Sequence, residues 1–350
     1  MPSIHHIFSI GSINIDTTFH VPHIVRPGET LASTHISSSF GGKGANASCA
    51  MRRAVPESVA SSTQPSIAIH HAGRVGIDGA AVRSFLESVG VQINLIDLDS
   101  TQHTGQAIIQ VDAAGENAIV LFSGANHTID ERFLRRVFDS IQQQYQHQRP
   151  TQRTPWIVLQ NEISHVAAAI SLAASLQFPI VLTPTPVTPS LLQYPIASAS
   201  LLCFNRGEAA CLASESMTPD PAVSADHKGL MARLGSKYPS AVLLVTLGAD
   251  GSLLGFPGVA EVISIRAAQC RQVVDTTGAG DTFVGYFVVG LSKRQAQLPF
   301  PAAESEDIRR LEMSKYVAAA NEASAAAALC VERSGAMSAI PVWSEVQDRL

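Results

Sequence analysis

The segment Val274–Phe283, VDTTGAGDTF, combines a carboxylate with a glycine-rich turn. Gly278, Ala279 and Gly280 are small enough for a ligand to approach their backbone. The helix expected to follow presents unpaired N–H groups and a partial positive charge, which suits an anion. Asp281 stands where it could accept a proton from an attacking hydroxyl. Such a base beside an anion site is what phosphoryl transfer requires. An isolated GxGD could equally be a helix start that Asp281 caps.

This turn matches neither of the two common glycine-rich nucleotide fingerprints. The chain contains no GxxxxGK[ST] P-loop, and the turn lacks the GxGxxG spacing of a dinucleotide-binding helix. A dehydrogenase is therefore disfavoured.

A second motif, Phe40–Asn46, reads FGGKGAN. The glycine backbone at Gly42, the ammonium of Lys43 and the amide of Asn46 could contact the hydroxyls of a polyol. Taken alone, the motif is more simply explained as a flexible turn with a solvated lysine.

A third polar pair, Asn14 and Asp16, follows the apolar run Ile7–Ile13. Two residues apart in an extended chain, they share a face and could clamp neighbouring sugar hydroxyls. In open α/β sheets, ligands bind at the carboxyl ends of strands, where this pair would lie. The ordinary alternative is an Asx turn that leaves the strand.

The elements that must position these motifs alternate between strand and helix. Strands are expected at 7–13, 66–71, 156–160, 180–183, 201–204 and 241–246, and helices at 78–89, 129–144, 164–176, near Glu208, at 227–237, after Gly280 and at 313–329. This pattern favours a parallel sheet covered on both faces. Segments 14–40 and 104–122 predict a smaller sheet. The segments 55–65, 142–155 and 294–307 are polar and contain proline, and we expect surface loops there.

The totals favour a well-packed enzyme. The chain has 350 residues, of which 46% are hydrophobic and 15% charged, with a net charge of −5. No Lys/Arg run points to nucleic acid or to an anionic membrane. Five scattered cysteines without a CxxC pair support neither a zinc site nor a disulfide framework. With no apparent secretory signal or 18-residue apolar run, we expect a reducing, soluble compartment: the cytoplasm, or the nucleus in a eukaryote.

In their order, these motifs resemble the PfkB carbohydrate kinase family and, within it, the ribokinases. The match runs from about residue 7 to residue 341 and also includes Gly105, SGAN at 123–126, TLG at 246–248 and RSGA at 333–336. The resemblance implies one ribokinase-like domain over 1–350: an α/β fold with a three-layer α/β/α core, a mostly parallel sheet and a small β-sheet lid formed by about 14–40 and 104–122. It also implies a homodimer assembled through that lid.

The resemblance assigns roles to individual positions. Asp281 would be the catalytic base, beside an anion hole formed by Gly278, Ala279 and Gly280. The remaining positions fall into three groups. The sugar-binding positions are Asn14, Asp16, Gly42, Lys43, Asn46 and Glu162. The ATP-binding positions are Asn205, Thr246, Gly248, Gly251 and Gly280. The metal positions are Asn205 and Glu208 for Mg²⁺ through water, and Asp275, Thr277, Cys330, Arg333 and Gly335 for a monovalent cation, expected to be K⁺.

Several of these positions have an ordinary structural alternative. Glu162 could cap the next helix, Asn205 and Glu208 could be a helix start with its capping box, and Thr246 could lie in a simple turn. The chain also departs from the family pattern. Ala339 stands where a hydroxyl often completes the cation site, 183–186 reads TPTP in place of NPAP, and Cys203–Phe204 precedes Asn205.

The expected reaction converts ATP and D-ribose into ADP and D-ribose 5-phosphate, with the lid excluding water from the site. Alternative substrates are another furanose or ketose such as fructose or deoxyribose, a nucleoside, or a sugar phosphate. A sugar phosphate would require basic residues near the lid, where 14–40 offers only Arg26. A non-catalytic sugar or nucleotide sensor is a further alternative, although such a protein need not keep Asp281 and its glycine turn.

Overall fold

Largely buried strands form the centre of a nine-stranded sheet in the computed structural model, which describes residues 4–57, 66–147, 153–302 and 305–350. The central strands, all parallel, are β1 (Ile4–Ile10), β8 (Trp156–Leu159), β9 (Ile180–Leu182), β10 (Leu201–Asn205) and β11 (Val242–Thr246). Beyond β1 the sheet continues in parallel with β4 (Ser66–Val75) and β5 (Gln92–Leu98). Beyond β11 it ends in antiparallel β12 (Ser252–Gly255) and β13 (Ile263–Ile265).

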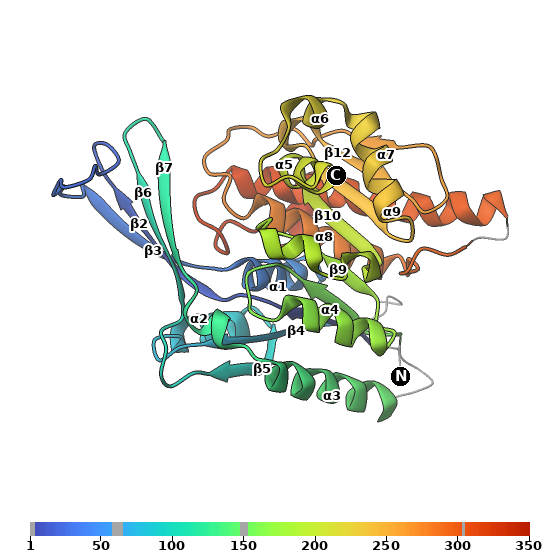
Figure 1. The fold of residues 1–350 in the computed structure, drawn as a ribbon, viewed down its shortest axis with the longest axis horizontal. Helices are drawn as coiled ribbons and strands as arrows, with labels where there is room; N and C mark the ends of the chain where they lie inside the picture. Colours follow the sequence, from blue (N-terminus) through green and yellow to red (C-terminus); the bar gives the residue numbers. More distant parts are fainter. Residues whose placement is uncertain (1–3, 58–65, 148–152, 303–304) are drawn as a thin grey trace.

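Helices cover both faces of this sheet (Figure 1). One face packs against α1 (Lys43–Ala54), α2 (Ala80–Ser88), α8 (Ala279–Lys293), α9 (Glu306–Val331) and α10 (Trp343–Gln347). The other packs against α3 (Glu131–His147), α4 (Val166–Ser175), α5 (Arg206–Ser214), α6 (Pro221–Ala225) and α7 (His227–Lys237). Short 3-10 turns lie at Gly124–Thr128, Pro189–Gln193, Ile196–Ser198 and Gly248–Asp250. The expected three-layer architecture and mostly parallel sheet are confirmed.

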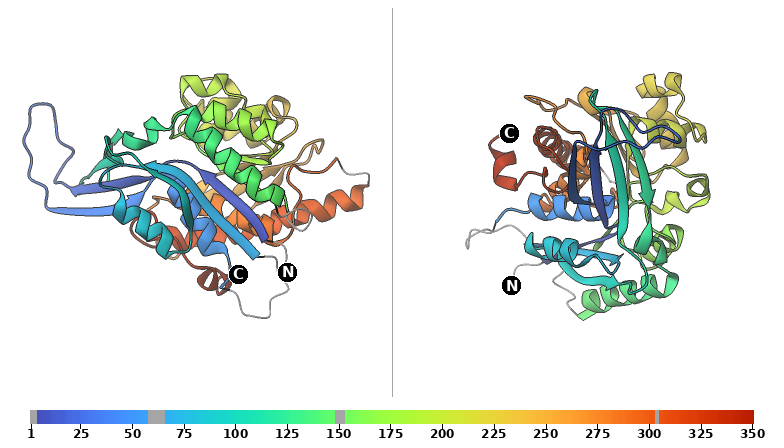
Figure 2. Two further views of the ribbon diagram at one scale, coloured as in Figure 1. Left: turned by 90° about the horizontal axis from the view of Figure 1, so that it is seen from below. Right: turned by 90° about the vertical axis from the view of Figure 1, so that its left-hand side faces the viewer.

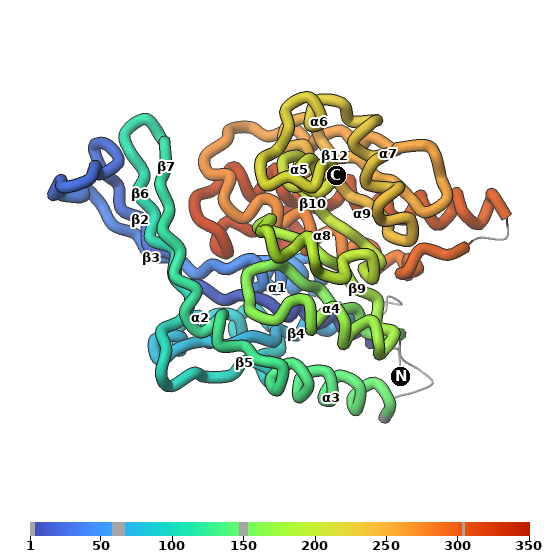
Figure 3. Tube along the Cα trace, viewed as in Figure 1, coloured from blue at the N-terminus to red at the C-terminus, as the bar shows by residue number. Residues whose placement is uncertain are grey.

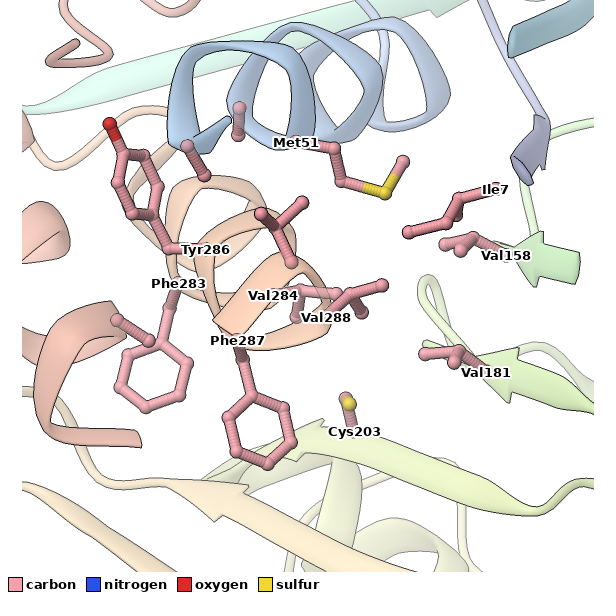
Figure 4. Packing of buried hydrophobic residues seen from close by; sticks show 14 of the residues in the cluster. Ile7, Met51, Val158, Val181, Cys203, Phe283, Val284, Tyr286, Phe287 and Val288 are labelled. Carbon is pink, nitrogen blue, oxygen red and sulfur yellow. The ribbon is translucent and has the colours of Figure 1, made fainter. Parts of the chain in front are cut away.

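The two faces hold separate apolar cores because successive strand residues point in opposite directions. Ile7 and Val158 face α1 and α8, whereas their neighbours Phe8 and Ile157 face α3 and α4. Figure 4 shows the first of these cores, in which side chains of α8 fill the space between the strands and Met51 of α1. Helices α1 and α8 therefore pack directly against each other as well as against the sheet.

The smaller sheet has the order β3-β2-β6-β7 and projects from one end of the larger one (Figures 1 and 2). Its strands are β2 (Asn14–His20), β3 (His35–Gly41), β6 (Gly105–Val111) and β7 (Asn117–Phe122). Two distant chain segments thus meet along the parallel pair β2–β6, as the trace in Figure 3 shows. The smaller sheet expected from 14–40 and 104–122 is present, and β6 and β7 form an antiparallel pair within it.

The structure corrects three expectations about loops. The segment 40–46 is not a flexible turn, because α1 begins at Lys43. The segment 142–155 is helical up to His147, since glutamine is compatible with a helix and α3 continues through it. The segment 294–307 includes the start of α9, where Ser305 caps the helix by accepting the N–H of Ile308. Parts of the loops expected at 55–65, 142–155 and 294–307 lie outside the described residues, namely 58–65, 148–152 and 303–304.

All five cysteines are free thiols, and four of them are buried. Within the described ranges, no helix is both long and apolar enough to cross a membrane.

The start of α1 lies close to the end of β1 because glycines line both. A Cβ on Gly44 would lie 2.6 Å from the backbone of Gly11. Gly42, just before α1, has a φ of 89°, and a Cβ there would lie 2.8 Å from the carbonyl oxygen of Ser12. Only glycine allows this conformation and this approach together.

Gly42→Ala should therefore lower the free energy of unfolding by about 3 kcal/mol, combining backbone strain with a steric clash. Gly28→Ala is the matched control, because Gly28 also has a positive φ (80°) but a Cβ there would have nothing within 4 Å. It should cost only about 1 kcal/mol. Urea denaturation measures both. If both variants lost the same free energy of unfolding, the close approach of α1 to β1 would not be what requires glycine at position 42.

Candidate active site

Two motifs that are 235 residues apart in the chain meet at the N-terminal ends of α1 and α8. The side-chain amide Nδ2 of Asn46 donates to Oδ2 of Asp281 at 2.8 Å. Because both helices begin at this point, their positive ends converge on the same space. The glycine-rich motif at 40–46 and the turn before α8 therefore form one site.

A carboxylate from a third strand completes this junction. Glu162, which follows β8, accepts the backbone N–H of Lys43 at 3.0 Å and the hydroxyl of Ser12 at 2.6 Å. Its Oε1 lies 3.8 Å from Nζ of Lys43. Glu162 thus binds the N-terminus of α1, and the expectation that it might cap the following helix is wrong.

Lys43 lies among several carboxylates. Burial alone would lower the pKa of its ammonium, but the negative charges of Asp281 and Glu162, with smaller effects of Glu208 and Asp16, give a net rise. Lys43 is therefore positively charged at neutral pH and offers hydrogen-bond donors to a ligand.

Asp16 of β2 faces the same space. Burial and the neighbouring charge of Glu162 raise the pKa of its carboxyl group to about 6. Oδ1 of Asp16 and Oδ1 of Asn46 are buried and have no hydrogen-bond partner among the described residues. Buried acceptors without partners are costly and few in native proteins, so two of them at one site indicate a ligand that brings donors, such as hydroxyl groups.

Asn14, at the start of β2, is held in place by a residue to which the sequence assigned no role. Asn126, in the turn Gly124–Thr128, donates from Nδ2 to Oδ1 of Asn14 at 2.8 Å and accepts the backbone N–H of Ile13 at 2.9 Å. Its motif, SGAN, was part of the family resemblance but carried no local signal of function. Ser12, which binds Glu162, was missed in the same way.

The turn before α8 has the geometry of an anion site. Gly278 takes the N-cap position with a φ of 75°, and no side chain caps the helix. The alternative in which Asp281 is an ordinary cap is therefore wrong, because its carboxylate accepts from Asn46 instead. Burial raises the pKa of Asp281 to about 6, against the opposing effects of Lys43 and of the Asn46 hydrogen bond. A carboxylate with this pKa is suited to accept a proton near neutral pH.

Asn205 and Glu208 do form a capping box at the start of α5. Oδ1 of Asn205 accepts the backbone N–H of Glu208 at 2.9 Å, and Glu208 accepts the backbone N–H of Asn205 at 2.9 Å. The expectation that this pair is a helix start with its capping box is therefore correct. The charge of Glu208 nevertheless acts on Lys43 and Asp281, which places the pair at the edge of the site.

The expected nucleotide-binding residues lie along the next strand. Thr246 is paired with Asn205 across β10 and β11. Gly248 and Gly251 flank the turn that follows, with φ of 64° and 93°, and a Cβ on Gly251 would collide with the carbonyl oxygen of Ile265. In the large sheet, β11 follows directly after β10 in the strand order, so Thr246 and its turn lie next to Asn205.

The loop that carries Asp275 is held to the segment that follows α9. Asp275 accepts the backbone N–H groups of Thr277 and Gly335, both at 2.9 Å. Although burial opposes the change, these hydrogen bonds lower the pKa of its carboxyl group. The Sγ atom of Cys330 lies 3.9 Å from the carbonyl oxygen of Thr277. The guanidinium of Arg333 pairs with Glu345 at 2.5 Å, so only the backbone of Arg333 could serve a cation here.

The described residues contain no group of three or more His, Cys, Asp or Glu side chains that could hold a metal ion.

Comparison with known proteins shows the family to which the chain belongs. The model of the pfkB family carbohydrate kinases matches residues 4–343. The ribokinase of Haemophilus influenzae is 29% identical over 345 residues, covering 97% of each chain. The ribokinase of Cryptococcus neoformans var. grubii, solved in complex with ADP, is 33% identical with a TM-score of 0.73 and covers 99% of this chain and 100% of its own. The Giardia lamblia ribokinase is 26% identical with a TM-score of 0.78, covering 98% of each. The chain therefore belongs to the pfkB family of carbohydrate kinases.

Proposed function

We propose that this chain is a ribose kinase that transfers the γ-phosphoryl group of ATP to the primary 5-hydroxyl of D-ribose. The observation that carries the proposal is the Asn46–Asp281 hydrogen bond, which brings a carboxylate beside polar residues suited to a polyol. The relatives of known name reported above are ribokinases, and one was solved with ADP. These names support ribose and ATP over the other substrates of this family.

Asp281 acts as the base in this mechanism. It accepts the proton of the 5-hydroxyl as that oxygen attacks the γ-phosphorus, while the bond from the γ-phosphorus to the bridging oxygen of ADP breaks. The products are ribose 5-phosphate and ADP. The backbone N–H groups at Gly278, Ala279 and Gly280 stabilise the charge that develops on the phosphoryl oxygens. Lys43 contributes a positive charge to the same region.

The sugar would be bound by polar residues near Asp281. The acceptor oxygens of Asp16 and Asn46 that lack partners would each receive a sugar hydroxyl. Asn14, Gly42, Lys43 and Glu162 complete the proposed sugar site. Asn205, Thr246, Gly248 and Gly251 form the proposed ATP site, with Gly280 shared between the nucleotide and the anion hole.

The proposal includes two ions. Glu208 and Asn205 would hold Mg²⁺ through water, and the bound ion would neutralise phosphate charge. Asp275, whose carboxylate stays ionised, would hold a monovalent cation such as K⁺ together with backbone oxygens of Thr277, Cys330, Arg333 and Gly335. Ala339 offers no side-chain oxygen to this cation.

The smaller sheet is proposed as both lid and dimer interface. Strand registers place Asp16, Ala107 and Leu121 on one face. On the opposite face lie four exposed apolar side chains: Ile36, Ile108, Val120 and Phe122. A patch of this kind marks an interaction surface, and a second copy of the chain would cover it.

Asp281→Asn should reduce kcat by about 10²- to 10⁴-fold, because the amide cannot accept the proton of the hydroxyl. It should leave ribose affinity nearly unchanged, since Asn46 can still donate to the amide oxygen. An ADP-coupled assay measures turnover, and calorimetry measures ribose binding. Asp139→Asn, at an exposed position of α3, is the control and should remain fully active. Near-normal turnover of the Asp281 variant would reject it as the base.

The value of kcat/KM should fall about tenfold between pH 7 and pH 5, because Asp281 must be ionised to act and its pKa is raised to about 6. The raised pKa of Asp16 would steepen this loss. With an ordinary carboxyl pKa, kcat/KM would stay nearly unchanged down to about pH 5. Enzyme returned from pH 5 to pH 7.5 should regain its activity. A flat profile from pH 7 to pH 5 would contradict the assignment.

Val120→Asp should convert a dimer into monomers, because it places a charge within the apolar outer face of the lid. Leu121→Asp is the matched control: the two residues are adjacent and about equally exposed, at 65% and 64%, but point to opposite faces. The control should remain dimeric. Light scattering after size exclusion gives the masses. A wild-type monomer, or dissociation of both variants alike, would exclude this interface.

A further inference from the structure

A cavity of about 940 Å³ lies at the opposite ends of α1 and α8 from Asp281. Arg52 and Arg53 in the last turn of α1 line it, together with Lys293 and Arg294 at the end of α8. Helices of these lengths span about 18 to 22 Å, so the cavity is well separated from the site described above.

Positive charge predominates in this cavity, although the chain as a whole has a net charge of −5. Its lining contains four cationic side chains and only two carboxylates, those of Glu57 and Glu322. Glu322 is shared, with one oxygen 3.0 Å from Nζ of Lys293 and the other 2.6 Å from a guanidinium nitrogen of Arg294. The carboxylates therefore do not balance the cations.

Among the four cations that line the cavity, Arg52 differs in having no partner within the described residues. Arg53 donates to the carbonyl oxygens of Met337 and Ile340, which satisfies its guanidinium. Arg52 has no hydrogen-bond or ion-pair partner among the described residues, yet it is half-buried. A Cβ on Gly90 would lie 2.6 Å from Nε of Arg52, so the glycine makes room for the guanidinium at this wall.

An aromatic ring completes the lining. Nζ of Lys293 lies 3.1 Å from the ring centroid of Trp343. Burial lowers the pKa of Lys293 to about 8, against the opposing effect of Glu322. Arg52 and Lys293 both line the cavity, so an anion bound there could contact an ammonium and a guanidinium.

Attraction to the negative ends of α1 and α8 explains why cations gather here. It does not supply an acceptor for the guanidinium of Arg52, nor does it explain a cavity of this size. Pockets that bind small molecules have volumes of roughly 300 to 1,000 Å³. Guanidinium groups bind phosphate with paired hydrogen bonds, and an excess of two positive charges matches a dianion.

We propose that this cavity is a binding site for a small phosphate ester, held by Arg52 and Lys293 and separate from the catalytic centre. This proposal does not depend on the identity of the sugar that is phosphorylated. The phosphate ester would be bound at the C-terminal ends of α1 and α8.

Calorimetric titration of the full-length protein with glycerol 2-phosphate tests the proposal. Wild-type protein should bind it saturably, and Arg52→Gln should weaken binding by about 10- to 100-fold, the loss expected for charge-assisted hydrogen bonds. Arg233→Gln removes the same charge from an exposed position of α7, on the other face of the sheet, and should bind like wild type. Glycerol, which lacks the charge, should not bind.

Two further variants make the result decisive. Ser344→Glu places a negative charge at the exposed cavity wall, at the start of α10, and should also weaken binding. Asp281→Asn should not alter it, because Asp281 lies at the far end of α8. The proposal is overturned by absence of saturable binding up to about 10 mM, by equal binding to wild type and Arg52→Gln, or by loss of binding in Asp281→Asn.

Discussion

The contact between Asn46 and Asp281 is the interaction on which the rest of the site depends. It joins the first turns of α1 and α8, two helices that pack against each other along their length and against the same face of the sheet. Each helix brings a positive N-terminal end, and together they allow several carboxylates to lie close together. If the helices diverged at this end, Asp281 and the turn before α8 would no longer lie beside the proposed sugar-binding residues of α1.

The electrostatic balance of the site follows from this junction. The charges of four carboxylates act on the ammonium of Lys43: those of Asp281, Glu162, Glu208 and Asp16. Burial and the charge of Glu162 raise the pKa of Asp16 and of Asp281 to about 6, while the surrounding negative charges keep Lys43 protonated. A carboxylate that is ionised at neutral pH but can still accept a proton is what general-base catalysis needs. The unusual pKa values are therefore a consequence of packing two helix ends against one sheet edge.

Much of this arrangement could be predicted from the sequence, and the exceptions have physical causes. Apolar runs such as Ile180–Leu182 and the turn before α8 identify the sheet and the anion site, because they are local patterns. The helix at Lys43 was missed because its glycines suggest a turn, and only the approach of Gly44 to Gly11 explains them. Glu162 and Asn126 act through backbone groups far away in the chain, which no local pattern reveals.

A crystal structure of the protein with D-ribose and ADP tests the central claim most directly. The account predicts the C5 hydroxyl oxygen of ribose within hydrogen-bonding distance, about 2.6 to 3.2 Å, of a carboxylate oxygen of Asp281, with the ring hydroxyls on Asp16 and Asn46. Ribose bound elsewhere, or bound here with its C5 hydroxyl turned away from Asp281, would contradict it.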